Sequence, residues 1–284
     1  MRFYITDCFA EEKYQGNPLL AVIADKELSD EEQWQITKEI GFSESVFIDP
    51  VKHNGGYNVR IWMPHAGEVP FAGHPVLGAA WVIRHMLETE EEGPVILHLP
   101  LGDIPVAVQG DRLFMSQKEP VFGDCVSAEE AAAAFGISAD DIDHTYPVQR
   151  VSTGLASVII PLKERETLSR IRTQRDAFDA YKQKYPQNAC THIFFVRTGE
   201  AELAARCMTE DYREDPATGS ANGNLAGYLL QYDFFGARDI SWTVKQGEDM
   251  GRPSLLYVHG RHTDDTWTIE VGGRCCLAAS GEWK

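Results

Sequence analysis

The sequence has few basic residues for its size and no long apolar run. It contains 26 Lys and Arg against 43 Asp and Glu, which gives a formal net charge of −17. Nucleic acids and anionic membranes are bound by basic surfaces, so this charge argues against both as partners. No stretch approaches the ~20 apolar residues of a membrane span, and the N-terminal stretch is too polar for a signal peptide. We expect a cytoplasmic protein.

Cysteine is sparse and scattered, with no CxxC pair. In a cytoplasmic chain of this size such cysteines are expected to be free, partly buried thiols. Two adjacent cysteines in a strand point to opposite faces, which makes a joint metal site at the final pair improbable. The pattern predicts a metal-free protein, and the six positions are Cys8, Cys125, Cys190, Cys207, Cys275 and Cys276.

Length and composition indicate two folded lobes. At 284 residues the chain exceeds the usual size of one domain. Its apolar fraction of 43% is enough for buried cores, and neither low hydrophobicity nor low complexity suggests disorder.

Strands dominate the expected secondary structure, with a few capped helices between them. Ser29 and Glu32 form a capping-box pattern before a helix that Gly41 ends, and Ser127 and Glu130 repeat the pattern. Further helices are expected from near Pro75 to 87, over 176–185 and over 224–232. Strands are expected over 2–6, 19–24, 45–49, 57–63, 95–99, 104–109, 112–116, 148–153, 156–162, 191–197, 203–209, 241–246, 254–260, 266–273 and 275–283.

Two pairs of segments suggest an internal repeat. "GNPLLAVIAD" resembles "GLASVIIPL", and "FAGHPVLGAAWVI" resembles "TGSANGNLAGYLL". In the second pair a polar, glycine-bearing loop opens a helix rich in Gly and Ala. Many helix starts look like this, so the pattern alone leaves the repeat open. If the repeat is real, each lobe presents a helix N-terminus, which is a site suited to anions.

Three residues in the first half of the chain are candidates for chemistry. Gly73 lets the backbone approach a ligand closely, and His74 precedes the expected helix, where an imidazole can relay a proton. Glu44 lies between a helix stop and an apolar strand, where desolvation raises a carboxyl pKa toward use as a proton carrier. Taken singly, a loop histidine bonded to a carbonyl and a solvated acid are the more ordinary readings.

The stretch "REDPATGSANG" supplies candidates in the second half. Asp215 is either a turn carboxylate bonded to local amides or a carboxylate at the edge of an anion site. Thr218, Gly219 and Ser220 offer hydroxyls and a tight turn whose amides can bind an anion. No one of these signals decides between a capped turn and a ligand site.

The combination of motifs is specific. "YQGNPLLAVI", "IGFSESVF", "VRIWMPHAGEVPFAGHP", "STGLASVIIPL", "EDPATGSANG" and "KQGEDMGRPS" occur in an order and spacing typical of one family. The chain resembles, over essentially its whole length, the PhzF-like isomerases of phenazine biosynthesis, which are relatives of diaminopimelate epimerase.

The resemblance implies an α+β fold of two pseudo-symmetric lobes, each a mostly antiparallel sheet or barrel wrapped around a central helix. The expected lobes are residues 1–118, joined by the C-terminal strand at about 272–284, and residues 119–271. Members of the family use no metal, flavin or pyridoxal cofactor and are typically homodimers with the active site in the cleft between the lobes. The substrate is expected to be a small molecule with a carboxylate.

Residue roles follow from the resemblance. Glu44 matches the catalytic acid/base, and His74 and Asp215 match residues that position substrate and assist proton movement. Gly73, Gly219 and Ser220 match groups that hold the substrate. A glutamate of this kind can remove a proton from one carbon and return it to another while water is excluded, as in the isomerisation of a dihydro-hydroxyanthranilate.

Two other functions remain open. The fold can persist as a small-molecule-binding protein without turnover, although Glu44, His74 and Asp215 are all present. Epimerases of this fold use two cysteines, one on each side of the substrate carbon, and the two matching loops here contain none. Cys8 and Cys207 fall on expected strands as core thiols, which disfavours a thiol racemase.

Overall fold

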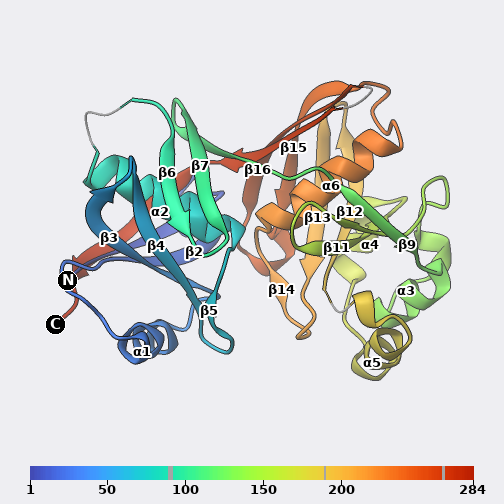
Figure 1. The fold of residues 1–284 in the computed structure, drawn as a ribbon. Coiled ribbons are helices and arrows are strands. Elements are labelled where there is room, and N and C mark those ends of the chain that lie inside the picture. Colours follow the sequence, from blue (N-terminus) through green and yellow to red (C-terminus); the bar gives the residue numbers. More distant parts are fainter. Residues whose placement is uncertain (89–91, 189, 264–265) are drawn as a thin grey trace. The chain divides into compact units, whose positions relative to one another are not determined.

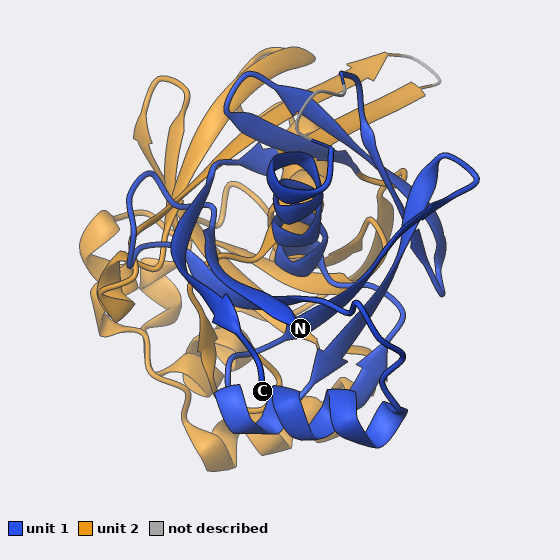
Figure 2. Cartoon of the chain, turned by 90° about the vertical axis from the view of Figure 1, so that its left-hand side faces the viewer, with its two compact units in different colours: residues 1–116, 272–284 blue, residues 117–271 orange. Residues whose placement is uncertain are grey.

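The computed structural model describes residues 1–88, 92–188, 190–263 and 266–284. The chain divides into two compact units (Figure 2). Unit 1 comprises residues 1–116 and 272–284, and unit 2 comprises residues 117–271. None of the described helices is long and apolar enough to cross a membrane.

Unit 1 is a mixed sheet with one helix inside it and one outside (Figure 1). The C-terminal strand returns to pair antiparallel with the first strand, from Arg2 opposite Glu282 to Cys8 opposite Cys275. The elements of this unit are β1 (Arg2–Cys8), β2 (Asn17–Ile23), α1 (Asp30–Ile40), β3 (Ser45–His53), β4 (Gly56–Met63), β5 (Gly67–Val69), α2 (Gly73–Met86), β6 (Val95–Leu99), β7 (Gly102–Gln109), β8 (Arg112–Ser116) and β18 (Cys275–Glu282).

Unit 2 contains a second mixed sheet and four α-helices within its described residues. The last strand, β17, reaches across the boundary into unit 1 at its end. The elements are β9 (Val121–Cys125), α3 (Ala128–Phe135), β10 (Gln149–Ser152), β11 (Ala156–Pro161), α4 (Arg165–Arg170), α5 (Arg175–Lys184), β12 (Thr191–Gly199), β13 (Glu202–Met208), β14 (Glu214–Asp215), α6 (Gly219–Gln231), β15 (Asp239–Gln246), β16 (Ser254–Thr263) and β17 (Thr266–Gly273), with short 3₁₀ turns at Ala139–Asp141, Pro186–Asn188 and Glu248–Met250.

The strand pairing of the two units is the same. In unit 1 the ladder runs β18–β1–β2–β3–β4–β6–β7, and in unit 2 it runs β9–β10–β11–β12–β13–β15–β16. In both, the third and fifth pairings are parallel and the others are antiparallel. A short strand, β5 or β14, is added antiparallel just before the long inner helix. The repeat suspected from sequence is therefore present in the fold.

One helix in each unit is buried on nearly all sides. α2 and α6 consist mostly of buried residues, which explains why both are rich in apolar and small residues on more than one face. Strands of unit 1 surround α2, which Figure 2 shows nearly end-on. The packing is close: a Cβ atom at Gly78 would lie 2.3 Å from Leu19 Cδ2 and 2.9 Å from Cys8 Sγ. Glycine at this position lets helix and strand approach each other.

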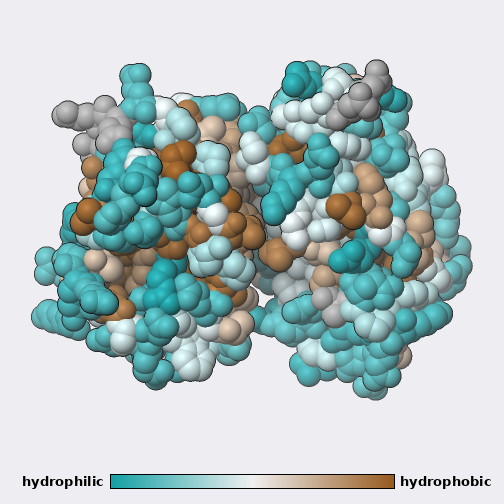
Figure 3. Space-filling model, in the orientation of Figure 1, coloured by the Kyte–Doolittle hydropathy of each residue, from teal (hydrophilic) through white to brown (hydrophobic). Residues whose placement is uncertain are grey.

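A second layer of helices covers the outer face of each sheet. In unit 1, α1 packs on Leu20, Val22, Phe47 and Trp62. In unit 2, α3, α4 and α5 cover a larger core that includes Val158, Ile160 and Phe194. Strands with helices on both faces read as continuous apolar runs, as "LLAVI" and "SVII" do. On the face drawn in Figure 3, hydrophilic side chains cover most of the surface, and hydrophobic patches are small.

The structure corrects three details of the expected helices. α2 begins at Gly73 and α6 at Gly219, so the polar "TGSANG" stretch forms the start of a helix instead of a loop. Ser127 caps α3 as expected, but Glu130 does not complete a capping box, because its carboxylate binds Lys184 and Tyr185. The elements absent from the sequence prediction are β5, β9, α4 and β14.

Candidate active site

Glu44 and His74 face each other in unit 1. Glu44 immediately precedes β3, and His74 lies in the first turn of α2. His74 Nε2 is 3.5 Å from Glu44 Oε2, and the two side chains are 6% and 13% exposed, respectively. This separation is slightly longer than a hydrogen bond of about 2.6–3.2 Å, so a small movement of either side chain would bring the carboxylate and the imidazole within reach for proton transfer. The two unit 1 residues expected to act together are therefore neighbours.

Asn17, the first residue of β2, fixes the ring of His74. Its Nδ2 lies 3.3 Å from His74 Nδ1, and both residues are buried. An amide nitrogen only donates, so Nδ1 is the acceptor, and the proton of the neutral ring sits on Nε2, the atom that faces Glu44. Asn17 belongs to the "GNP" part of the motif "YQGNPLLAVI", but sequence reasoning assigned it no role.

In unit 2, Asp215 is held by the residue at the start of α6. The Thr218 hydroxyl donates to Asp215 Oδ2 at 2.5 Å. Gln246, at the end of β15 and fully buried, donates from Nε2 to the Asp215 carbonyl at 2.8 Å and to the Thr218 hydroxyl at 3.1 Å. Because that hydroxyl accepts from Gln246, its own proton is directed at the Asp215 carboxylate.

Two further residues support this loop. Asn222 Nδ2 donates to the Thr218 carbonyl and to Gln246 Oε1, both at 2.9 Å. Gly247 has a positive φ of 76°, and a Cβ atom there would lie 2.4 Å from the Arg252 carbonyl and 2.6 Å from that of Pro216. The loop before α6 is therefore fixed by a buried polar network. Gln246 lies 28 residues after Thr218 and belongs to no motif that includes Thr218, so sequence reasoning missed this residue.

The starts of α2 and α6 differ from those of the other described α-helices. α1, α3, α4 and α5 each carry at least one carboxylate in the first turn. α2 and α6 carry none, and neither has a side-chain cap, because Ala72 has no polar side chain and the Thr218 hydroxyl binds Asp215. The positive ends of these two helix dipoles are thus left uncompensated by acids of their own first turns, which suits an anion.

The expected substrate-holding residues lie at these two starts. Gly73 is the first residue of α2, and Gly219 and Ser220 are the first two of α6. Gly219 is buried and Ser220 is partly exposed. Their positions allow backbone amides, and the Ser220 hydroxyl, to be offered to a ligand.

Two ion pairs brace the segments that carry the candidates. Arg60 binds Glu68 through two hydrogen bonds of 2.8 and 2.6 Å and also reaches Asp30 at the start of α1, so it ties β4, β5 and α1 together. Arg206 binds Glu214 in the same two-pronged way and is 5% exposed. Each unit thus has such an Arg–Glu pair between its long strand, β4 or β13, and the short strand added to it, β5 or β14.

The thiols are not prepared for proton abstraction. Cys8 and Cys207 are both buried on strands, as expected. Burial raises the pKa of the Cys207 thiol well above its usual value, and the charge of Asp215 adds to that shift. The pKa of Cys275 is also raised, through its contact with Cys8 and its burial. Thiolates are the reactive form, so these positions disfavour racemisation by a thiol pair.

We compared the chain with known protein families, curated proteins and solved structures. A family model described as phenazine biosynthesis-like protein matches residues 6–281. A trans-2,3-dihydro-3-hydroxyanthranilate isomerase of Pseudomonas aeruginosa is 28% identical, with 99% of this chain and 98% of that protein covered.

Solved structures extend the comparison. A PhzF-family protein of Bacillus anthracis superposes with a TM-score of 0.89 at 23% identity and covers 100% of this chain and 99% of its own. A predicted epimerase of Pseudomonas aeruginosa, at 31% identity, gives a TM-score of 0.82 with 99% and 98% covered.

The fold is thus that of the PhzF and diaminopimelate-epimerase-like proteins, α+β with two similar units. The chain belongs to the PhzC-PhzF family and is an isomerase of that family.

Proposed function

We propose that this isomerase moves a proton between carbons of a small carboxylate-bearing metabolite, with Glu44 as the acid/base and without a cofactor. The observation that carries the proposal is the largely buried Glu44–His74 pair at 3.5 Å. A carboxylate sheltered from water and beside an oriented imidazole is suited to taking a proton from carbon and returning it.

His74 would assist this transfer. With Nδ1 held by Asn17, its Nε2–H can donate to the Glu44 carboxylate or to a substrate oxygen that gains charge as the proton leaves. The imidazole would in this way stabilise negative charge and keep Glu44 in its reactive orientation.

Asp215 and the start of α6 would bind the substrate. The amides of Gly219 and Ser220, at an end of α6 that carries no acid in its first turn, suit a carboxylate. Asp215, held by Thr218, would accept a hydrogen bond from a hydroxyl or amino group of the same molecule. Gly73 at the start of α2 would offer its amide in the same manner.

The relative from Pseudomonas aeruginosa is named for trans-2,3-dihydro-3-hydroxyanthranilate, a ring that bears a carboxylate and an amino group. That compound, with other small cyclic carboxylates, is the first substrate to offer this protein. Family resemblance further predicts a cytoplasmic homodimer.

The proposed proton transfer can be tested by measuring the incorporation of solvent deuterium into the substrate. The protein is incubated in D₂O with a panel of such carboxylates, and mass spectrometry follows deuterium entering carbon positions. Glu44→Gln should lower incorporation by at least 10²-fold, because the carboxamide cannot accept the proton. Glu39→Gln, an exposed acid on α1, is the matched control and should leave incorporation unchanged.

Circular dichroism and thermal melting must show that Glu44→Gln is folded. Undiminished exchange in folded Glu44→Gln would remove Glu44 from its role. Retention of a panel member by the unaltered protein with neither deuterium exchange nor isomerised product would instead favour a binding protein without turnover.

A further inference from the structure

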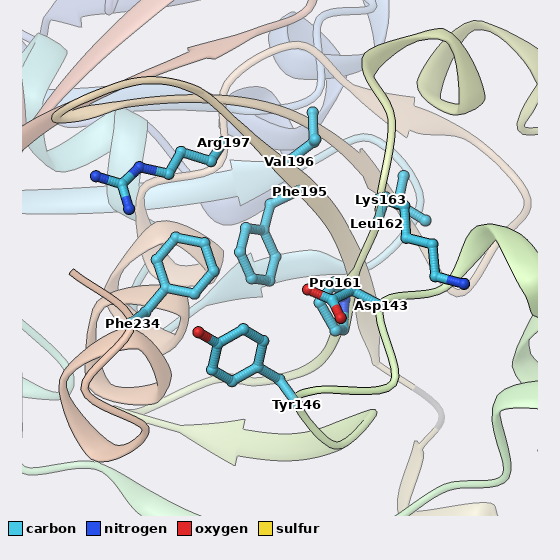
Figure 4. Close-up of a pocket in the computed structure, with 9 residues that line it drawn as sticks. All are labelled: Asp143, Tyr146, Pro161, Leu162, Lys163, Phe195, Val196, Arg197 and Phe234. Atoms are coloured by element: carbon cyan, nitrogen blue, oxygen red, sulfur yellow. The ribbon is translucent and has the colours of Figure 1, made fainter. Parts of the chain in front are cut away.

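A pocket in unit 2 lies away from the candidate active-site residues. It has a volume of about 370 Å³ and is lined by the segment before β10, the end of β11, β12 and the turn after α6 (Figure 4). Its residues include Tyr146, Phe195 and Phe234. This volume falls in the range of small-molecule sites.

The pocket is remote from the start of α6. Phe234 follows the last residue of that helix, whereas Asp215, Thr218 and Gly219 lie at its first turn. α6 has 13 residues, so its two ends are about 20 Å apart at 1.5 Å per residue. A ligand in this pocket would not touch Asp215 or the first-turn amides.

Three aromatic rings form one wall. The ring centroids of Tyr146 and Phe234 are 5.1 Å apart, and those of Phe195 and Phe234 are 5.5 Å apart. These distances are too short for an aromatic cage around a cation. In such a cage each ring centroid lies up to about 6 Å from the cation, so two rings on opposite sides of it are farther apart than the rings here. The three rings therefore touch one another. Phe195 is only 1% exposed, so the partly exposed rings of Tyr146 and Phe234, which Phe195 supports from behind, offer the surface on which a flat apolar ring can pack.

The charged residues of the pocket are Asp143, Lys163 and Arg197, so its lining is net positive in a chain of formal charge −17. None of the three forms an ion pair with another residue in the described part of the chain. Arg197 binds the Gly199 carbonyl through Nε and the Glu200 carbonyl through Nη2, which leaves Nη1 to donate elsewhere. Lys163 donates to one carbonyl, that of Asp140.

Figure 4 shows the rings together, with Arg197 on one side of them and Asp143 and Lys163 on the other. A cation at one side suits a carboxylate, and the Asp143 carboxylate suits a hydroxyl or amino donor at the opposite end of the same ring.

We propose that unit 2 holds a second small-molecule site, which takes a single-ring aromatic carboxylate with a hydroxyl or amino group on the far side of the ring. The partly exposed rings of Tyr146 and Phe234 pack against the ligand, Arg197 binds its carboxylate and Asp143 accepts from its donor. Binding here does not depend on the proton-transfer reaction.

The experiment titrates uniformly ¹⁵N-labelled protein with 4-hydroxyphenylacetate up to roughly 10 mM and follows amide shifts. Shifts should concentrate around Phe195, Arg197 and Phe234. Phenylacetate, which lacks the donor, and tyramine, which lacks the carboxylate, should each bind more weakly, and cyclohexylacetate should bind weakest because its ring is not flat.

Arg197→Gln should weaken binding about tenfold or more, since it removes a charge-assisted hydrogen bond. Arg172→Gln is its matched control, because Arg172 is also exposed and also binds two backbone carbonyls in unit 2. Phe234→Leu, which keeps the apolar bulk, should weaken binding of the aromatic probes and spare cyclohexylacetate. Glu44→Gln should bind as the unaltered protein does.

Absence of shifts at the highest concentration would overturn the proposal. So would shifts centred on Gly73, Gly219 or Ser220, or equal affinities for Arg197→Gln and Arg172→Gln. None of these results bears on deuterium exchange at Glu44.

Discussion

The Nε2 atom of His74 lies 3.5 Å from Oε2 of Glu44. Glu44 comes from the end of the loop before β3, and His74 comes from the first turn of α2. Asn17, at the start of β2, orients the imidazole of His74 toward Glu44. Because the two side chains lie so close, a change at either residue should be felt at the other.

Asn17 should determine the tautomer of His74. In the unaltered protein the neutral ring carries its proton on Nε2, and ¹⁵N spectra of the imidazole should show Nδ1 as the unprotonated nitrogen. Asn17→Asp presents only acceptors to Nδ1 and should move the proton there. Asn58→Asp, on the exposed side of β4, is the control. An unchanged imidazole spectrum in Asn17→Asp would contradict the assignment.

Thr218 should matter through its hydroxyl. Thr218→Val keeps the shape of the side chain but leaves the Gln246 amide and the Asp215 carboxylate without their shared partner. Unfolding by urea should show a loss of about 1–3 kcal/mol. Thr218→Ser retains the hydroxyl and should lose much less. A larger loss in Thr218→Ser than in Thr218→Val would mean that methyl packing, and not the hydrogen bond, is what the position requires.

His192 should make the protein sensitive to acid. The residue is buried against Phe135 and Phe178, and desolvation lowers its pKa from 6.5 to about 3. The unfolded chain therefore binds a proton at a higher pH than the folded chain does. The stability from the neutral ring is present above pH 6.5 and is lost as pH falls toward 3, by up to about 1.4 kcal/mol per pH unit.

Thermal or urea unfolding between pH 7 and 4 measures this effect against His192→Phe, which keeps an aromatic ring in the cluster. The variant should show a shallower decline of stability with falling pH. Parallel curves for the two proteins would rule out His192 as the source.

Replacing only one member of the largely buried Arg206–Glu214 ion pair should lower the free energy of unfolding strongly. Glu214→Leu leaves the guanidinium of Arg206 without its carboxylate, although the Leu168 and Ile171 carbonyls remain bound to it. The expected loss in free energy of unfolding is about 3–5 kcal/mol.

The double variant Arg206→Met, Glu214→Leu should recover part of this loss, because no buried charge is left. Recovery should be incomplete, since the two carbonyls lose their donor. A double variant no more stable than Glu214→Leu would show that the pair stabilises the fold through more than charge compensation.

Local signals explain which elements could be predicted. α1 was placed to within a residue because Ser29, Glu32 and Gly41 carry both of its caps. α6 was placed too late because Gly219, Ser220 and Asn222 are poor helix formers on their own. Their helical conformation is stabilised by burial inside the sheet of unit 2, which is a tertiary effect. The two-residue strand β14 exists only through pairing with β13 and leaves no periodic pattern.

The candidate site divides in the same way. Motifs singled out Glu44, His74 and Asp215, since polar residue types beside glycine-rich helix starts are visible in the sequence. The roles of Asn17 and Gln246 were invisible there, because each meets its partner through strand and helix packing and not through spacing.

By itself, the sequence determined the alternation of apolar strands and capped helices, the acidic character of the chain and the motifs of its family. Only the tertiary structure decided which polar groups meet: His74 with Glu44 and Asn17, Thr218 with Asp215 and Gln246. The physical reason is that local conformation depends on neighbours along the chain, whereas a buried hydrogen bond requires the folded core to bring distant donors and acceptors within about 3 Å.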